Sequence, residues 1–200
     1  EELLDDLNKL KGWPEKVRTM QKNWIGKSDG SIIKFNINES NSKESIRVYT
    51  TRVDTIFGVS YIVISPENEL VDRLVDKKRL KELQLYRERL SKITSEERLD
   101  ESKNKNGMYI GKQAINPING ELVPIWIADY VLNDYGTGAV MGVPGHDQRD
   151  YLFARSNKLT VKFVISPIKN NADFFQNEGY SAEGYLINSA QFNGLCNMEA

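Results

Sequence analysis

Two short segments concentrate the side chains that are able to do chemistry. The first, Thr50-Thr51-Arg52-Val53-Asp54-Thr55, offers three hydroxyls, a guanidinium and a carboxylate at the end of an alternating apolar segment. Such a set can line a polar cleft. Thr and Asp at the end of a strand also cap the turn that follows, which is the more common use of these residues. Residue types alone leave both interpretations open.

The second segment runs from Gly136 to Asp150 and joins a glycine-rich stretch to the start of a helix. Asp147 and Asp150 are three residues apart, so they face the same side of that helix. Asp147 suits an N-cap and Asp150 a first-turn carboxylate, both of which the helix dipole favours. Alternatively, the pair serves a pocket, of which the glycines form a wall because they permit close backbone approach.

Two nucleotide-binding motifs fail when their spacing is tested. Gly26-Lys27-Ser28 resembles the end of a phosphate-binding loop, but Gln21 stands where that motif requires a glycine. Gly136-Thr137-Gly138 with Gly142 resembles a dinucleotide fingerprint. However, its third glycine falls one residue late, and no regular βαβ unit surrounds it.

His146 and Cys196 are the only histidine and the only cysteine. A zinc site built from them and carboxylates would lack the usual pairs of ligands at helical spacing. We therefore expect no metal and no cofactor. A Cys196–His146 nucleophile pair is formally possible, but a free cysteine is usually a simple packing group.

Hydrophobic periodicity predicts the helices and strands that must position these segments. Their order along the chain indicates a mixed α/β or α+β core, which is barrel-like and has flanking helices. Residues 1–30 form the helical entry, and residues 31–200 form a single globular domain. Asn119-Gly120 predicts a hairpin, and Pro124 predicts an edge strand or a bulge. We expect helices over 3–10, 14–26, 66–98 and 147–156, and strands over 33–37, 46–50, 59–65, 108–115, 122–128, 160–165 and, more weakly, 184–187.

Composition excludes several classes of protein. With 27 basic and 28 acidic side chains, the chain lacks the excess of Lys and Arg that coats a long nucleic acid, although a pocket for one nucleotide end remains compatible. No apolar run reaches membrane-spanning length. An acidic start without an initiator Met indicates a piece of a longer chain, which we expect in the cytoplasm or in an organelle.

Together the two polar segments resemble the editing domain of bacterial-type leucyl-tRNA synthetases. The matching motifs are Thr50-Thr51-Arg52-x-Asp54-Thr55-x-x-Gly58 and Gly136–Met141 with His146–Asp150. Residues 12–17 and 23–28 resemble the entry strut of that family, and residues 192–195 resemble an exit strut near 185–200. The aminoacylation signatures of the family are absent, so we expect that this piece cannot charge tRNA and that ATP binding belongs to the full-length enzyme.

The resemblance implies post-transfer editing, in which a positioned water hydrolyses the ester of tRNA for leucine that carries norvaline, isoleucine or methionine. It implies that Thr55 excludes leucine and that Asp150 binds the α-ammonium, with Asp147 in support. Thr50, Thr51 and Arg52 would contact the ribose and the ester. The remaining implied substrate contacts are Tyr135, Met141, Val143 and His146. The implied partners are the 3′-terminal aminoacyl-adenosine and the rest of the synthetase chain, in a monomer.

Three alternatives stay open. The nearest is the editing domain of an isoleucyl- or valyl-tRNA synthetase, which differs only in substrate. A second is a non-catalytic module that holds a tRNA acceptor end. A serine or thiol hydrolase that uses His146 is disfavoured, because the sequence has no Gly-x-Ser-x-Gly elbow.

Overall fold

The computed structural model describes residues 2–25, 30–39, 42–99, 105–134 and 136–199. The chain divides into two compact units, Glu1–Gly30 and Ser31–Ala200. The first unit contains two helices that contact each other, α1 (Glu2–Leu7) and α2 (Glu15–Ile25). Helix α1 ends three residues before the position that the sequence predicts, and the predicted stop at Gly26 lies outside the described residues.

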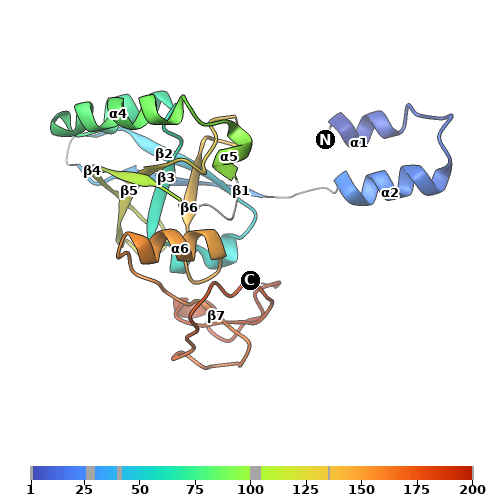
Figure 1. The fold of residues 1–200 in the computed structure, drawn as a ribbon. Coiled ribbons are helices and arrows are strands. Elements are labelled where there is room, and N and C mark those ends of the chain that lie inside the picture. The colour runs from blue at the N-terminus through green and yellow to red at the C-terminus, as the bar shows by residue number, and fades with distance from the viewer. Residues whose placement is uncertain (1, 26–29, 40–41, 100–104, 135, 200) are drawn as a thin grey trace. The chain divides into compact units, whose positions relative to one another are not determined.

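Six strands form one mixed sheet in the second unit (Figure 1). Most neighbours are antiparallel, but β3 runs parallel to β5. The outermost strands, β2 and β6, contact each other, so the sheet curls into the barrel-like core that the sequence predicts. In the order β2-β1-β4-β5-β3-β6, the strands are Ser45–Thr50, Ser31–Ile37, Gly107–Ile115, Leu122–Ala128, Tyr61–Ile64 and Ala139–Gly142.

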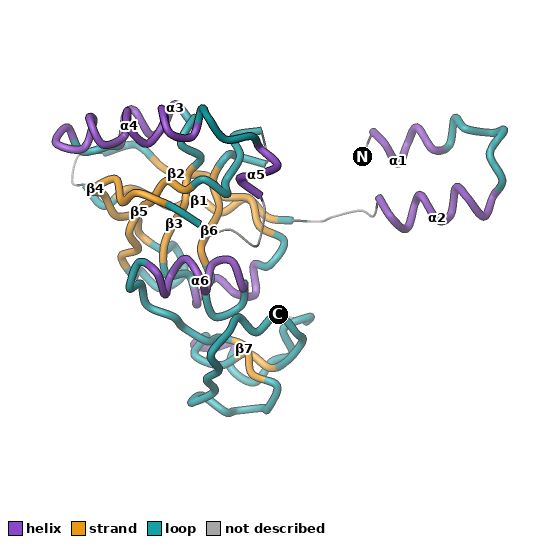
Figure 2. The backbone as a smooth tube through the Cα atoms, in the orientation of Figure 1, coloured by secondary structure: helices purple, strands orange, loops and turns teal. Residues whose placement is uncertain are grey.

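Strand alternation sends the two faces of β3 to different helices. Ile62 and Ile64 join an apolar core that includes Leu83 of α4 (Leu80–Leu90). Tyr61 and Val63 pack in a second cluster with Phe153 of α6 (Gln148–Ser156). Figures 1 and 2 accordingly show α4 and α6 on opposite sides of the sheet.

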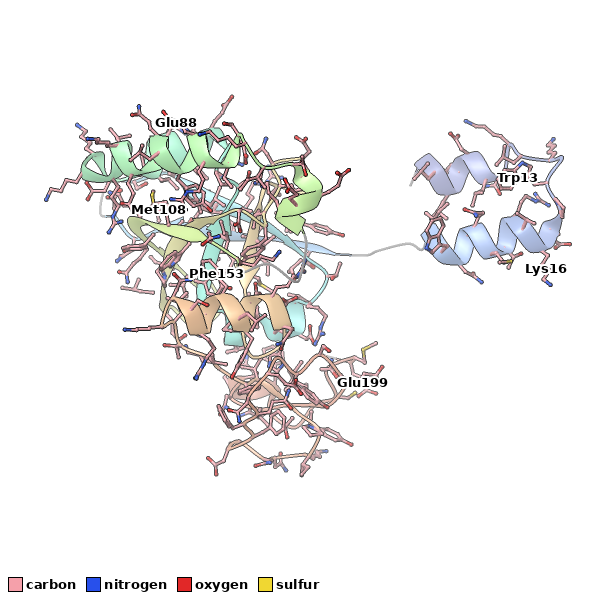
Figure 3. All side chains as sticks on the ribbon, in the orientation of Figure 1. Trp13, Lys16, Glu88, Met108, Phe153 and Glu199 are labelled. Carbon is pink, nitrogen blue, oxygen red and sulfur yellow. The ribbon has the colours of Figure 1, made fainter. Side chains whose placement is uncertain are left out.

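The charged region after β3 forms several short helices rather than one long helix. It contains α3 (Glu69–Leu74), the 3-10 helix η2 (Lys77–Arg79), α4 and α5 (Ser95–Leu99). Leu83, Tyr86 and Leu90 of α4 are buried, whereas Glu88 stands on its exposed side (Figure 3). The mixed charges of this region therefore belong to solvated helix faces, as their pattern predicts.

One strand prediction is wrong, and one strand was not predicted. Within residues 160–165 only Ile165 is in a strand, β7 (Ile165–Ser166), which pairs with β8 (Tyr185–Leu186). Residues 139–142 of the glycine-rich stretch form β6, which the sequence did not indicate. Pro124 lies in an internal strand rather than at an edge, and the pairing of β4 with β5 has the predicted irregularity beside it, between Tyr109 and Gln113. Because β3 pairs only with residues 125–127 of β5, the missing N–H of Pro124 removes no bond to β3.

Candidate functional site

A cavity of about 560 Å³ lies within the second unit and holds nearly all of the residues that the sequence singles out. This volume suits a small-molecule or nucleotide ligand. Two walls meet across it. The threonine wall is residues 50–55, and the aspartate wall is residues 141–150. Tyr135 lies outside the described residues; the other implied site residues that line the cavity are Thr50, Thr51, Arg52, Thr55, Met141, Val143, His146, Asp147 and Asp150.

The threonine wall begins where β2 ends at Thr50 and continues into a 3-10 helix, η1 (Val53–Gly58). The Thr50 hydroxyl accepts a hydrogen bond from the Arg52 amide at 3.0 Å. The Thr55 hydroxyl donates to the Arg52 carbonyl at 2.7 Å, and Thr55 is 1% exposed. These threonines therefore both stabilise the turn and line the cavity, so the two interpretations of the sequence coexist.

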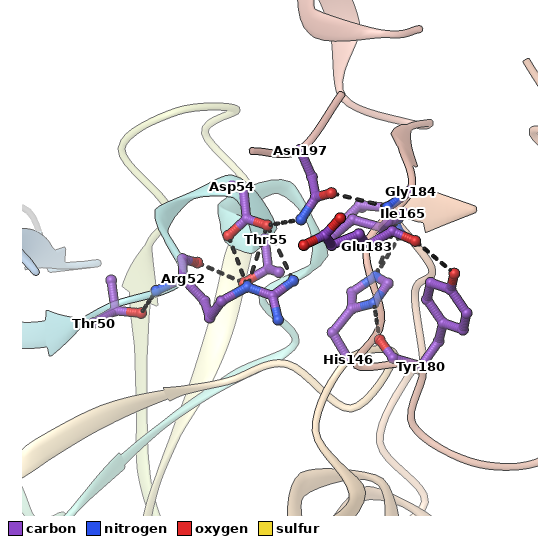
Figure 4. Close-up of polar contacts among 11 residues, drawn as sticks. Thr50, Arg52, Asp54, Thr55, His146, Ile165, Tyr180, Glu183, Gly184 and Asn197 are labelled. Carbon is purple, nitrogen blue, oxygen red and sulfur yellow. Dashed lines mark hydrogen bonds and ion pairs between the residues drawn. The ribbon is translucent and has the colours of Figure 1, made fainter. Parts of the chain in front are cut away.

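An ion pair completes the threonine wall (Figure 4). Arg52 donates from Nε to Asp54 Oδ1 at 3.1 Å and from Nη2 to Oδ2 at 3.0 Å. Asn197, from the far end of the chain, donates to Asp54 Oδ2 at 3.1 Å and accepts from the Gly184 amide at 2.9 Å. The Asp54 carboxylate, whose side chain is 9% exposed, thus has a cation and a neutral donor.

The aspartate wall begins at β6 and ends in the first turn of α6. Asp147 is the N-cap of α6, and its side chain accepts from the amides of Arg149 at 2.9 Å and Asp150 at 3.1 Å. The capping role that the sequence predicts for Asp147 is therefore confirmed. Met141 and Val143 are buried and supply apolar surface to the cavity.

Among the described residues, Asp150 has no cation within ion-pair distance. Its Oδ2 accepts from the Val143 amide at 2.8 Å, and its Oδ1 lies 3.2 Å from the Tyr61 hydroxyl and 3.3 Å from the Tyr130 hydroxyl. Within the part of the chain that the structure describes, no basic side chain forms an ion pair with it.

This environment changes the charge behaviour of Asp150. Burial, and to a lesser extent the charge of Asp147, raises the pKa of the Asp150 carboxyl to about 7, against the opposing effects of the Val143 amide, the Tyr61 hydroxyl and Arg149. A carboxyl that is buried among neutral donors at the edge of a cavity is suited to bind a cationic ligand group.

His146 serves the fold rather than proton transfer. Its Nδ1 lies 2.8 Å from the Tyr180 carbonyl, and its Nε2 accepts from the amides of Val164 and Ile165 at 2.8 and 3.2 Å (Figure 4). Burial lowers the pKa of His146 to about 4, so the ring is neutral and Nδ1 carries the hydrogen. His146 lines the cavity as expected, but both ring nitrogens are engaged with the backbone, which leaves neither for a substrate.

Sequence reasoning missed Tyr61, Tyr130 and Asn197. The two tyrosines lie in or next to apolar strands, where their type indicates packing. The available signal was the phenol itself, because a buried hydroxyl needs a hydrogen-bond partner. Among the described residues, no group of acidic, Cys or His side chains is placed to hold a metal ion, and no helix is long and apolar enough to cross a membrane.

Comparison with known proteins agrees with this geometry. The family model described as "Leucyl-tRNA synthetase, editing domain" matches residues 22–200. The leucine–tRNA ligases of Prochlorococcus marinus (strain MIT 9211) and of a Synechococcus species (strain CC9311) are 54% and 50% identical over 96% and 99% of this chain. The chain spans only 22% and 23% of their lengths.

A solved structure gives the same result. It is the ternary complex of the Agrobacterium radiobacter K84 agnB2 leucyl-tRNA synthetase with tRNA and LeuAMS, which superposes with a TM-score of 0.67 at 38% identity. The match covers 85% of this chain and 20% of that one. These findings favour the leucyl family over the isoleucyl and valyl families. With its mixed six-stranded sheet and its two-walled cavity, the chain belongs to the family of leucyl-tRNA synthetase editing domains.

Proposed function

We propose that this domain hydrolyses the ester of tRNA for leucine that carries norvaline, isoleucine or methionine. The observation that carries the proposal is the Asp150 carboxyl, which is buried at the edge of the cavity and forms no ion pair with any basic side chain that the structure describes. A mischarged tRNA presents an α-ammonium next to its ester. That ammonium is the cation that the aspartate wall lacks.

The α-ammonium binds Asp150 in its ionised form. An opposite charge at hydrogen-bond distance favours ionisation, so binding lowers the raised pKa of this carboxyl. A charge-assisted hydrogen bond of this kind contributes about 1.5–3 kcal/mol and fixes the ester relative to the threonine wall. Asp147 supports the anchor by holding the first turn of α6.

Thr55 excludes leucine from the opposite wall. Its side chain is branched at Cβ, and the hydrogen bond from its hydroxyl to the Arg52 carbonyl holds it in one orientation. One methylene changes binding in an apolar pocket by about 1–3 kcal/mol, so a second site that rejects the correct side chain adds discrimination that one site cannot supply.

The remaining residues orient the reacting group. Thr50, Thr51 and Arg52 contact the terminal ribose and the ester, and Met141 and Val143 pack against the apolar parts of the substrate. A water attacks the ester carbonyl, and positioning and electrostatic stabilisation supply the rate. The His146 ring is not the general base, because both of its nitrogens are bound to the backbone.

The partners in this proposal are the 3′-terminal aminoacyl-adenosine of tRNA for leucine and the rest of a synthetase chain. A complex with tRNA is the state of the similar Agrobacterium radiobacter enzyme. We place the protein in the cytoplasm, as a monomer. Its formal net charge of −1 gives this piece little long-range attraction for tRNA, so its own affinity is weak.

The test is deacylation of isoleucyl-, norvalyl- and leucyl-tRNA for leucine at high enzyme concentration, with wild type and Asp150→Asn. We expect wild type to hydrolyse the two mischarged tRNAs and to spare leucyl-tRNA, and we expect the variant to lose hydrolysis of both mischarged tRNAs. The alternative of a non-catalytic acceptor-end module predicts binding of mischarged analogues without turnover. An absence of turnover in a full-length synthetase that carries this domain would overturn the proposal.

A further inference from the structure

Two tyrosine hydroxyls meet at Asp150, although they come from distant parts of the chain. Tyr61 is the first residue of β3, and Tyr130 lies in the turn after β5. Both side chains join the apolar cluster that contains Phe153 of α6. The two hydroxyl oxygens lie 3.4 Å apart, and each lies within 3.3 Å of Asp150 Oδ1.

The tyrosine rings are held rigidly. Tyr61 is fully buried and stacks on Phe153 with ring centroids 5.3 Å apart, and Tyr130 meets the same ring edge-on at 5.7 Å. Gly142 of β6 lies against the Tyr61 ring so closely that an added Cβ would be 2.3 Å from Tyr61 Cζ. The hydroxyl positions are therefore set by packing that is independent of any ligand.

Both hydroxyls keep their hydrogens near neutral pH. Burial, followed by the charge of Asp150, raises the pKa of both phenols well above the ordinary value. A phenol that stays protonated donates to an ionised carboxylate and is also able to accept from a protonated one. The two phenols can therefore hydrogen-bond to Asp150 whether its carboxyl is ionised or protonated.

We propose that Tyr61 and Tyr130 are positioning residues that direct their hydroxyls to Asp150 Oδ1 and thereby orient the carboxylate for the substrate ammonium. Oδ1 then has two phenol donors, whereas the Val143 amide is the only donor to Oδ2 among the described residues, which leaves a lone pair of Oδ2 for the ammonium. This inference deepens the proposed function and rests on it, because the substrate ammonium is the ligand that Asp150 is proposed to bind.

The arrangement also sets the charge of Asp150. The groups that face it are Asp147 and Arg149 on its own segment, the two phenols and the Val143 amide. Hydrogen bonds to the ionised form favour that form, so loss of a phenol donor raises the pKa of the carboxyl. A smaller fraction of the protein is then ready to bind an ammonium at neutral pH.

The test compares Tyr61→Phe, Tyr130→Phe and Asp150→Ala with wild type in hydrolysis of isoleucyl-tRNA for leucine across pH, after subtraction of uncatalysed hydrolysis. Tyr86→Phe is the matched control, because Tyr86 is also buried but donates to the Asn106 carbonyl, outside the cavity. We expect the acid limb of kcat/KM to move up by about one pH unit in each of the first two variants. That shift means a loss of roughly tenfold at about pH 6.5 and of less than about threefold at about pH 8.5.

A second readout does not need turnover. The ¹³C chemical shift of the Asp150 carboxyl, followed by NMR, reports its titration directly. We expect its midpoint to rise by about one pH unit in Tyr61→Phe and to stay unchanged in Tyr86→Phe.

The outcomes separate the two proposals. An unshifted acid limb and midpoint in the Tyr61 and Tyr130 variants, with activity lost in Asp150→Ala, would overturn the role of the tyrosines alone. An equal loss of kcat/KM at every pH in the two tyrosine variants would show that Tyr61 and Tyr130 act only through packing, and would also overturn their proposed positioning role. Full activity in Asp150→Ala would remove the proposed function itself.

Discussion

Each wall of the cavity contains a carboxylate that is largely shielded from solvent, and the two have different hydrogen-bond partners. Asp54 in the threonine wall binds the Arg52 guanidinium and the Asn197 amide. Asp150 in the aspartate wall has two phenols and a backbone amide. Burial raises the pKa of Asp150 to about 7; Arg149 opposes that effect, but no basic side chain of the described residues forms an ion pair with this carboxyl.

This difference shows which of the two carboxylates already has a cation partner within the protein. A buried charge is stable when it is paired, so the Asp54–Arg52 pair stabilises the threonine wall without a ligand. A carboxyl with only neutral donors is more weakly ionised and gains more from a cation that arrives from outside. Residue type alone does not distinguish the two carboxylates; their partners do.

The largest expected effect comes from Asp150→Ala. It removes the ammonium anchor, so kcat/KM for mischarged tRNA falls by about 10- to 150-fold, the equivalent of one charge-assisted hydrogen bond. Deacylation kinetics measure this change. The control is Asp173→Ala, an exposed aspartate that does not line the cavity. Wild-type kinetics in the Asp150 variant, with circular dichroism showing an intact fold, would contradict the comparison of the two walls.

Next in size is a gain of activity in Thr55→Ala. Opening the threonine wall lets leucine enter, so hydrolysis of leucyl-tRNA rises by about 10- to 100-fold. Two matched variants separate the effect of the Thr55 side-chain shape from the effect of its hydrogen bond. Thr55→Val keeps the branched shape and loses the bond to the Arg52 carbonyl, and Thr55→Ser keeps the hydroxyl and loses the methyl group. We expect the valine variant to reject leucine and the serine variant to admit it; the reverse pattern would assign exclusion to the hydrogen bond.

A smaller effect is expected from Asn197→Ala, which removes the hydrogen bond between Asn197 and Asp54 of the threonine wall. The variant loses bonds to Asp54 and to the Gly184 amide, so its free energy of unfolding falls by about 1–3 kcal/mol. In a domain of this size each kcal/mol corresponds to about 2–4 °C in Tm, which calorimetry resolves. The acid limb of hydrolysis stays in place, because Asn197 does not contact Asp150. A shifted limb would show that the two walls are coupled.

The smallest expected effect is a pH dependence of stability. Asp150 has a pKa of about 7 in the folded chain, above its ordinary value, so the folded state binds a proton that the unfolded state has already lost between about pH 4 and pH 7. The contribution of Asp150 to stability is present below about pH 4 and is lost as pH rises through about 7. Tm of Asp150→Asn relative to wild type should therefore increase by a few degrees from about pH 5 to pH 8. A constant difference would contradict the raised pKa.

The fold was predictable where periodicity was strong. Ile33 to Ile37 alternate and form part of β1, and the charged run after β3 is helical. The strand expected over 160–165 is nearly absent, and the amides of Val164 and Ile165 at its end bind His146 Nε2. Strand β6 was missed because its glycine neighbours resemble a turn, whereas its pairing with β3 decides its conformation.

The candidate site was predictable as two segments but not as a cavity with unequal walls. Thr55 and Asp150 were identified from motifs. The partners of Asp150 were not, because Tyr61 and Tyr130 lie 69 residues apart and meet only in the folded cluster around Phe153 of α6. The charge state of a carboxyl depends on such distant neighbours, and a sequence does not display them.

The bond between Asp54 and Asn197 joins residues that lie 143 positions apart. Long-range contacts form late in folding, because the entropy lost in closing a long loop must be offset by contacts already made. All six strands of the sheet have been synthesised once Gly142 is added, whereas the bond to Asp54 needs Asn197, 55 residues later. A nascent chain therefore cannot complete the contacts of its threonine wall before residue 197 has been added.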